Sequence, residues 1–120
     1  GYMQRDKELS QLTDDHSWVA QLVREGHITP EQARVHPNRN VITKALGIEN
    51  ELVPDIITEE IQTGDTILLC SDGLHGLVED EDISETLDEL PIQDALDALI
   101  QLANDKGGDD NITAVVVAIH

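Results

Sequence analysis

The chain has 120 residues, which is the size of one domain and is long enough to bury a hydrophobic core. Aromatic residues make up only 2% of it, so aliphatic side chains must form that core. With 25 acidic and 7 basic residues the formal charge is -18, which repels nucleic acid and anionic membranes, and we exclude both as partners. A phosphorylated substrate meets the same repulsion unless divalent cations reverse the local sign.

The single cysteine, Cys70, excludes an internal disulfide and fits a reducing compartment. Residues 1–6 lack the apolar segment of a secretory signal, and no apolar run approaches the roughly 18 residues of a membrane span. We therefore expect a cytoplasmic protein.

Residues 2–12 are typical of a hairpin around the turn at 5–7, with a very short first strand. From Asp15 the apolar residues within 18–23 share one helical face, and Gly26 stands where a helix ends. The pattern predicts a short amphipathic helix.

A capping box follows. Thr29 stands at a helix N-cap, Pro30 at the first helical position, and Gln32 three residues after the cap. The pattern predicts a second short helix toward His36, where Pro37 stops it.

Four segments favour strands. Residues 41–46 and 55–61 are strand-like, and the second ends at a turn over 62–65. Residues 66–70 and 112–119 are almost continuously apolar, which predicts two strands buried on both faces.

Two helices complete the chain. An acidic run precedes apolar positions near 83–87, and its charge suits the positive end of a helix dipole. Residues 91–106 carry one apolar stripe and are followed by Gly107, which predicts a helix packed on a sheet. The elements indicate a layered arrangement of helices and sheet, with one face of the sheet lacking an obvious cover.

Two aspartates adjoin the apolar strands. Asp72 follows the strand at 66–70 in a loop, and Asp110 precedes the strand at 112–119. If these strands pair antiparallel, both carboxylates converge at one edge of the sheet, where they suit a hard divalent cation such as Mg²⁺ or Mn²⁺. Ordinary turn or capping aspartates remain the alternative.

Three segments carry a family resemblance. Leu68 to Leu74 contains Ser-Asp-Gly, residues 107–117 begin Gly-Gly-Asp-Asp-Asn, and residues 11–17 read Gln-Leu-Thr-Asp-Asp-His-Ser. In this order and spacing they resemble the C-terminal half of the bacterial metal-dependent serine/threonine protein phosphatases of the type 2C (PPM) family. The resemblance covers nearly the whole chain.

This resemblance implies an α+β fold that is part of a four-layer α-β-β-α sandwich with mainly antiparallel sheets. It implies two or three Mn²⁺ or Mg²⁺ ions that assist attack of water on phosphoserine or phosphothreonine in proteins modified by serine/threonine kinases. Asp72 and Asp110 match metal ligands, while Gly73 and Asn111 match residues that support the metal loops. Asp109 lies beside the motif, and we expect it to be solvated.

The resemblance also implies that residues 1–120 belong to one catalytic domain, with a flap at about 17–47 beside the active site. His36 and Arg39 lie in the part of the flap that would reach a phosphorylated substrate, although both also fit ordinary surface positions. We expect His16 to hold the loop after the hairpin rather than to bind a metal.

The family's other metal motifs, an Asp-Gly-Met-Gly-Gly loop among them, are absent from these 120 residues. We therefore expect only part of the metal site here and no catalytic residue besides the ligands. We further expect that the chain alone is inactive and that a missing N-terminal half or a second copy covers its sheet. The alternative is a noncatalytic phosphatase-like interaction module.

Overall fold

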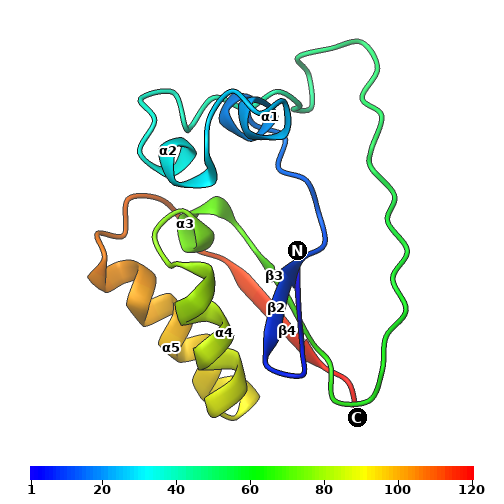
Figure 1. Cartoon of the computed structure of the whole chain (residues 1–120), viewed down its shortest axis with the longest axis vertical. Helices are drawn as coiled ribbons and strands as arrows, with labels where there is room; N and C mark the ends of the chain where they lie inside the picture. Colours follow the sequence, from blue (N-terminus) through cyan, green and yellow to red (C-terminus); the bar gives the residue numbers. More distant parts are fainter. The chain divides into compact units, whose positions relative to one another are not determined.

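The computed structural model describes all residues from 1 to 120, and these form two compact units. Unit 1 comprises residues 1–13 and 58–120, and unit 2 comprises residues 14–57. Figure 1 shows the course of the chain through both. None of the helices has the length and apolar character needed to cross a membrane.

Unit 1 contains an antiparallel sheet of four strands in the order β2-β1-β3-β4. The strands are β1 (Tyr2–Arg5), β2 (Glu8–Gln11), β3 (Thr66–Cys70) and β4 (Ala114–Ala118). The predicted antiparallel pairing of the two most apolar segments is confirmed, since β3 and β4 pair over five positions from Thr66↔Ala118 to Cys70↔Ala114. With its helices, the sheet gives unit 1 the α+β class that we expected.

The predicted hairpin at the start of the chain is confirmed by the pairing of β1 with β2. Its two turn residues, Asp6 and Lys7, have φ values of 51° and 66°. Two successive positive φ values are the mark of a type I′ turn, whose twist matches that of the strands it joins. The hairpin places β1 beside β3 in the middle of the sheet.

Three helices accompany this sheet: α3 (Asp72–His75), α4 (Asp80–Glu89) and α5 (Ile92–Asp105). The acidic run lies in the first turn of α4, where negative side chains are favourable. Gly107 lies just beyond α5 with a φ of 134°, a value that favours glycine. In Figure 1, α4 and α5 lie side by side, and contacts join α4 to β1 and β2 and join α5 to β4.

The core lies between these helices and one face of the sheet. The strand register places Tyr2, Leu68 and Val116 in one row across β1, β3 and β4; Tyr2 and Leu68 belong to the core cluster, and the partly buried Val116 packs against it. From the helices, Ile83 and Leu99 are fully buried against them. Burying each such side chain stabilises the fold by roughly 1.5–3 kcal/mol relative to leaving it exposed. These buried side chains therefore hold the helices against this face of the sheet.

The opposite face of the sheet differs from our prediction. Leu69 is 52% exposed, Val115 52% and Val117 44%, so the expectation that β3 and β4 are buried on both faces is wrong for this chain. The cause is that α4 and α5 pack against the other face alone, and alternate side chains of β3 and β4 have no helix of unit 1 above them.

Unit 2 contains two short helices, α1 (Trp18–Arg24) and α2 (Pro30–Arg34). Ser17 caps α1 by accepting a hydrogen bond from the Ala20 amide at 3.2 Å. The capping box predicted for α2 is present, because the Thr29 amide donates to Gln32 Oε1 at 2.9 Å and the Gln32 amide donates to Thr29 Oγ1 at 3.1 Å. The second helix ends at Arg34, two residues before the predicted end.

The strands predicted at 41–46 and 55–61 are wrong. The first region contributes only an isolated bridge, Ser17↔Ile42, and residues 50–61 run without regular structure. Both segments have the composition of strands, but a strand also needs a neighbour for its backbone N–H and C=O groups. The chain offers none along most of their length.

A buried ion pair fastens the turn that precedes β3. Arg5 Nε and Nη2 donate to Asp65 Oδ1 and Oδ2 at 2.8 and 2.6 Å, and the Gln62 amide donates to Asp65 Oδ2 at 2.7 Å. Asp65 is only 2% exposed. Since Arg5 ends β1 and Asp65 immediately precedes β3, this pair aligns the two central strands.

We predict that the Arg5–Asp65 pair makes the stability of the fold depend on pH in the acidic range. The Arg5 guanidinium and then the Gln62 amide lower the pKa of Asp65 to about 2. A carboxyl with a lower pKa in the folded chain than its usual value of about 3.9 stabilises the fold above pH 4, and this stabilisation disappears as pH falls toward 2. The variant Asp65→Asn should lower the melting temperature at pH 6 much more than at pH 2.

Thermal unfolding between pH 2 and pH 6, together with an NMR titration of the Asp65 carboxyl, measures this dependence. Asp6→Asn is the control, because Asp6 is an exposed turn residue without an ion pair. Titration of the folded Asp65 near pH 4 would contradict the prediction.

Candidate metal centre

The ends of β3 and β4 carry the two aspartates that the sequence singled out. Beyond the last strand pair, the Ser71 amide donates to the Thr113 carbonyl at 2.9 Å, and the Thr113 amide donates to Ser71 Oγ at 3.0 Å. Ser71 Oγ also donates to the Asn111 carbonyl at 3.2 Å. These bonds continue the hydrogen-bond ladder beyond the paired strands. They hold the segment that follows β3 against the segment that precedes β4.

Gly73 allows a still closer approach. A Cβ atom at this position would lie 2.2 Å from the Asn111 carbonyl oxygen and 3.5 Å from the Asp110 carbonyl carbon. The first distance is far inside van der Waals contact, so any larger residue would push the two segments apart. Gly73 is buried at this contact, which is the physical reason for a glycine beside Asp72.

Both carboxylates stand at this edge of the sheet. Asp72 is the first residue of α3, so Ser-Asp-Gly begins a helical turn and does not lie in the open loop that we expected. Asp110 accepts a hydrogen bond from the Asn111 amide through Oδ1 at 2.7 Å. Asp72 and Asp110 are exposed and form no ion pair, which leaves oxygen atoms of both available to a ligand.

The donor set fits part of a site for a hard divalent cation. Two exposed carboxylates on adjoining segments are the oxygen ligands that Mg²⁺ and Mn²⁺ prefer. No group of three or more His, Cys, Asp or Glu side chains in the chain is arranged to hold a metal ion. The metal-binding role of Asp72 and Asp110 therefore stays a prediction.

His36 and Arg39 lie together in unit 2. The His36 ring packs edge-on against Trp18 with ring centroids 5.3 Å apart, and its Nδ1 accepts a hydrogen bond from the Asn38 amide at 3.0 Å. Arg39 Nη1 donates to the His36 carbonyl at 3.3 Å. These contacts shape the turn after α2, and the guanidinium of the exposed Arg39 keeps other donors for a ligand.

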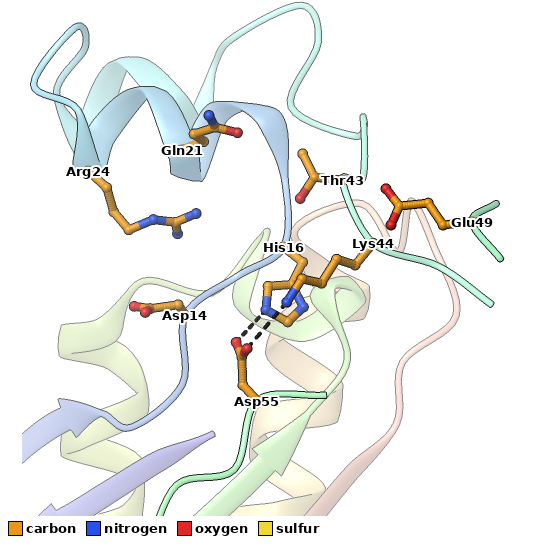
Figure 2. Close-up of a pocket in the computed structure, with 8 residues that line it drawn as sticks. All are labelled: Asp14, His16, Gln21, Arg24, Thr43, Lys44, Glu49 and Asp55. Carbon is orange, nitrogen blue, oxygen red and sulfur yellow. Dashed lines mark hydrogen bonds and ion pairs between the residues drawn. The ribbon is translucent and has the colours of Figure 1, made fainter. Parts of the chain in front are cut away.

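A pocket of about 390 Å³ in unit 2 was not anticipated from the sequence. The Asp55 carboxylate, which lines it, contacts His16 Nε2 at 2.6 Å and Lys44 Nζ at 3.3 Å, as Figure 2 shows. The hydrogen bond from His16 and then that from Lys44 lower the pKa of Asp55. No local pattern signals this cluster, because its members lie far apart in the sequence. The lining residues are Asp14, His16, Gln21, Arg24, Thr43, Lys44, Glu49 and Asp55.

Known proteins resemble the chain over nearly its whole length, although no protein-family model matches it. Protein phosphatase PhpP of Streptococcus pneumoniae is 39% identical over 117 residues, which are 97% of the chain and 48% of PhpP. Serine/threonine phosphatase Stp of Listeria monocytogenes is 42% identical over 118 residues, which are 98% of the chain and 47% of Stp. The chain thus spans about half the length of these curated relatives.

Solved structures agree with these relatives. The serine/threonine phosphatase Stp1 of Staphylococcus aureus superposes with a TM-score of 0.91 at 41% identity, covering 99% of the chain and 47% of Stp1. The catalytic domain of the phosphatase PstP, solved with two manganese ions, gives a TM-score of 0.84 at 43% identity, covering 96% of the chain and 47% of that structure. Over nearly its whole length the chain therefore resembles about half of the bacterial PPM-type serine/threonine phosphatases.

We predict that Gly73→Ala opens the metal-site edge. The added methyl group cannot occupy a position 2.2 Å from the Asn111 oxygen, so the two segments must separate and the Ser71–Thr113 bonds must weaken. Hydrogen exchange of the Ser71 and Thr113 amides measures the effect and should accelerate strongly.

Gly26→Ala is the matched control. Gly26 has a φ of 78° but no atom within 4 Å of the added group, so it should cost about 1–2 kcal/mol of local strain without touching this edge. Equal exchange of the Ser71 and Thr113 amides in both variants would contradict the role assigned to Gly73.

Proposed function

We propose that the protein to which this chain belongs hydrolyses phosphoserine and phosphothreonine in proteins, with Mn²⁺ or Mg²⁺ as cofactor. The carrying observation is that the segments holding Asp72 and Asp110 adjoin at one edge of the paired strands β3 and β4. Similarity to PhpP and Stp supports the reaction class. Phosphoproteins made by serine/threonine kinases are the proposed substrates, and the cytoplasm is the proposed location, which fits the lone Cys70 without a disulfide.

Asp72 and Asp110 are the proposed metal ligands in this chain. Gly73 holds their segments together through its close approach to Asn111, and the Asn111 amide orients Asp110. Two or three ions, when bound, supply Lewis-acid polarisation of the phosphoryl group and lower the pKa of bound water. Binding of a phosphoprotein also requires these cations, because a chain of charge -18 otherwise repels the phosphate group.

Residues 1–120 are proposed to be the C-terminal half of one catalytic domain with a four-layer α-β-β-α architecture. The exposed apolar side chains of Leu69, Val115 and Val117 support this, because they form a surface that a second sheet would bury. The covering layer comes from an N-terminal half or, for the isolated chain, from a second copy.

The flap is proposed to extend over about residues 17–47, inside unit 2. Its proposed substrate contacts are His36 and Arg39. The Arg39 guanidinium is suited to phosphate because its planar N–H donors bind two oxygens at once. The edge-on packing of His36 against Trp18 would hold the turn that presents Arg39.

We predict that the full-length protein dephosphorylates a phosphothreonine peptide only when Mn²⁺ or Mg²⁺ is present. Asp72→Asn or Asp110→Asn should reduce turnover by more than the 10–100-fold typical of residues that merely support a metal ligand. Asp109→Asn is the control, because Asp109 is an exposed neighbour outside the proposed site, and its turnover should stay unchanged. Full activity of both ligand variants would exclude them as ligands.

We further predict that the 120-residue chain alone lacks this activity. A binuclear centre has two ions about 3.5–4 Å apart. Two carboxylates are too few to hold such a pair against hydration. Isothermal titration with Mn²⁺ should detect at most one weak site, and light scattering should detect dimers that cover the apolar sheet face. Turnover by a purified monomer would refute this prediction.

A noncatalytic interaction module is the second candidate, favoured by the absence of any group of three metal-binding side chains. The same phosphopeptide assay on the full-length protein distinguishes the two. An inactive full-length protein that still binds the phosphopeptide would establish the interaction module.

A further inference from the structure

Ser71 stands at the junction where β3 ends and α3 begins, beside the loop that leads into β4 (Figure 1). Its backbone is extended, with φ -76° and ψ 166°, and it occupies the N-cap position of α3. A serine at an N-cap commonly accepts a hydrogen bond from an amide of its own helix through its hydroxyl. The Ser71 hydroxyl makes no such bond, so its contacts serve something other than the cap of α3.

The hydroxyl takes the place of a backbone carbonyl in the strand ladder. The register of β3 with β4 ends at Cys70↔Ala114, so the next opposing pair is Ser71 and Thr113. In a regular hydrogen-bonded antiparallel pair, the two residues exchange both of their N–H···O=C bonds. The Ser71 amide does donate to the Thr113 carbonyl at 2.9 Å, but the Thr113 amide donates to Ser71 Oγ at 3.0 Å. One half of this pair therefore depends on a side chain.

This exchange of acceptors leaves the Ser71 carbonyl to the helix. It accepts a hydrogen bond from the Leu74 amide at 3.1 Å, in the first turn of α3. A carbonyl that points into this turn does not also point across the ladder at Thr113, so the hydroxyl supplies the missing acceptor. The chain can therefore pass from strand to helix directly before Asp72 without leaving the Thr113 amide unpaired.

The same oxygen atom also binds the segment that carries Asp110. Ser71 Oγ donates to the Asn111 carbonyl at 3.2 Å. Asp72 directly follows Ser71 in the sequence. Asp110 directly precedes Asn111, so this bond joins the immediate neighbours of the two aspartates. The Asn111 amide in turn donates to Asp110 Oδ1 at 2.7 Å, and a displacement of Ser71 is therefore passed to both aspartates.

We propose that Ser71 is a positioning residue of the metal centre, whose hydroxyl fixes the segments that carry Asp72 and Asp110 relative to each other and thereby raises the affinity for the divalent cation. This rests on the proposed function, in which the two carboxylates bind Mn²⁺ or Mg²⁺. Such ions bind oxygen ligands at closely defined distances, about 2.0–2.1 Å for Mg²⁺. Segments that are held in place before the ion binds need less ordering when it does. Ser71 acts on the metal only through the two aspartates.

Calorimetric titration of the full-length protein with Mn²⁺ tests the proposal. Ser71→Ala should weaken Mn²⁺ binding about 10- to 100-fold, which is the loss typical of groups that orient a metal ligand without binding the metal. Turnover of a phosphothreonine peptide at saturating Mn²⁺ should fall much less, because excess Mn²⁺ fills the weakened site. Ser71→Thr keeps the hydroxyl and should keep an affinity close to that of the native protein.

Ser10→Ala is the matched control. Ser10 Oγ also donates to a backbone carbonyl of the neighbouring strand, that of Met3 at 3.4 Å, but it lies on β2, at the opposite side of the sheet from β4. Removing this hydroxyl should leave Mn²⁺ affinity and turnover unchanged. Native Mn²⁺ affinity in Ser71→Ala would overturn the role of Ser71 and would leave the proposed function intact. A full-length protein that binds no Mn²⁺ would overturn both.

Hydrogen exchange of the metal-free protein measures the hydroxyl contact itself. The Thr113 amide should exchange about 3- to 10-fold faster in Ser71→Ala, because it loses its acceptor oxygen. It should keep its native rate in Ser71→Thr and Ser10→Ala, and an unaltered rate in Ser71→Ala would contradict the contact on which the proposal rests. If Ser71→Ala does not fold, Ser71→Cys decides, since a thiol is a weak hydrogen-bond partner, and native Mn²⁺ affinity in that variant would overturn the proposal equally.

Discussion

The antiparallel pairing of β3 with β4 is the contact on which the rest of unit 1 depends. The two strands come from residues 66–70 and 114–118, and their register brings the end of one beside the start of the other. One face of the pair receives α5, while the strand ends carry Asp72 and Asp110. A shift of one residue would turn Leu68 and Val116 out of the core and would part the segments that Gly73 and Ser71 join.

The sequence predicted this part of the molecule well because its signals are local and mutually consistent. Strongly apolar runs predicted β3 and β4, and the capping box at Thr29 and Gln32 predicted α2. The positions of Asp72 and Asp110 were predicted by a further rule. When two antiparallel strands are neighbours, the end of one strand and the start of the other lie at the same edge of the sheet. The metal-binding role itself rests on the family resemblance.

Other features were beyond local reasoning. Residues 55–61 have the composition of a strand, yet strand formation depends on a partner that composition does not reveal. The exposure of Leu69 and Val115 likewise depends on which layers surround the sheet. The cluster of His16, Lys44 and Asp55 joins residues up to 39 positions apart, and no spacing rule connects a lone histidine with a distant carboxylate.

Unit 2 has a particular place in the connectivity of the chain, since both of its ends continue into unit 1, at residues 13 and 58. The pairing of β1 with β3 and the Arg5–Asp65 ion pair hold together the parts of unit 1 that precede and follow unit 2 in the sequence. None of these residues lies in unit 2. Doubling the length of such a connection adds only about 0.6 kcal/mol to the entropy of closing it. The architecture therefore lets unit 2 be lengthened, shortened or given another sequence at small thermodynamic cost, while the strands that lead to Asp72 and Asp110 stay the same.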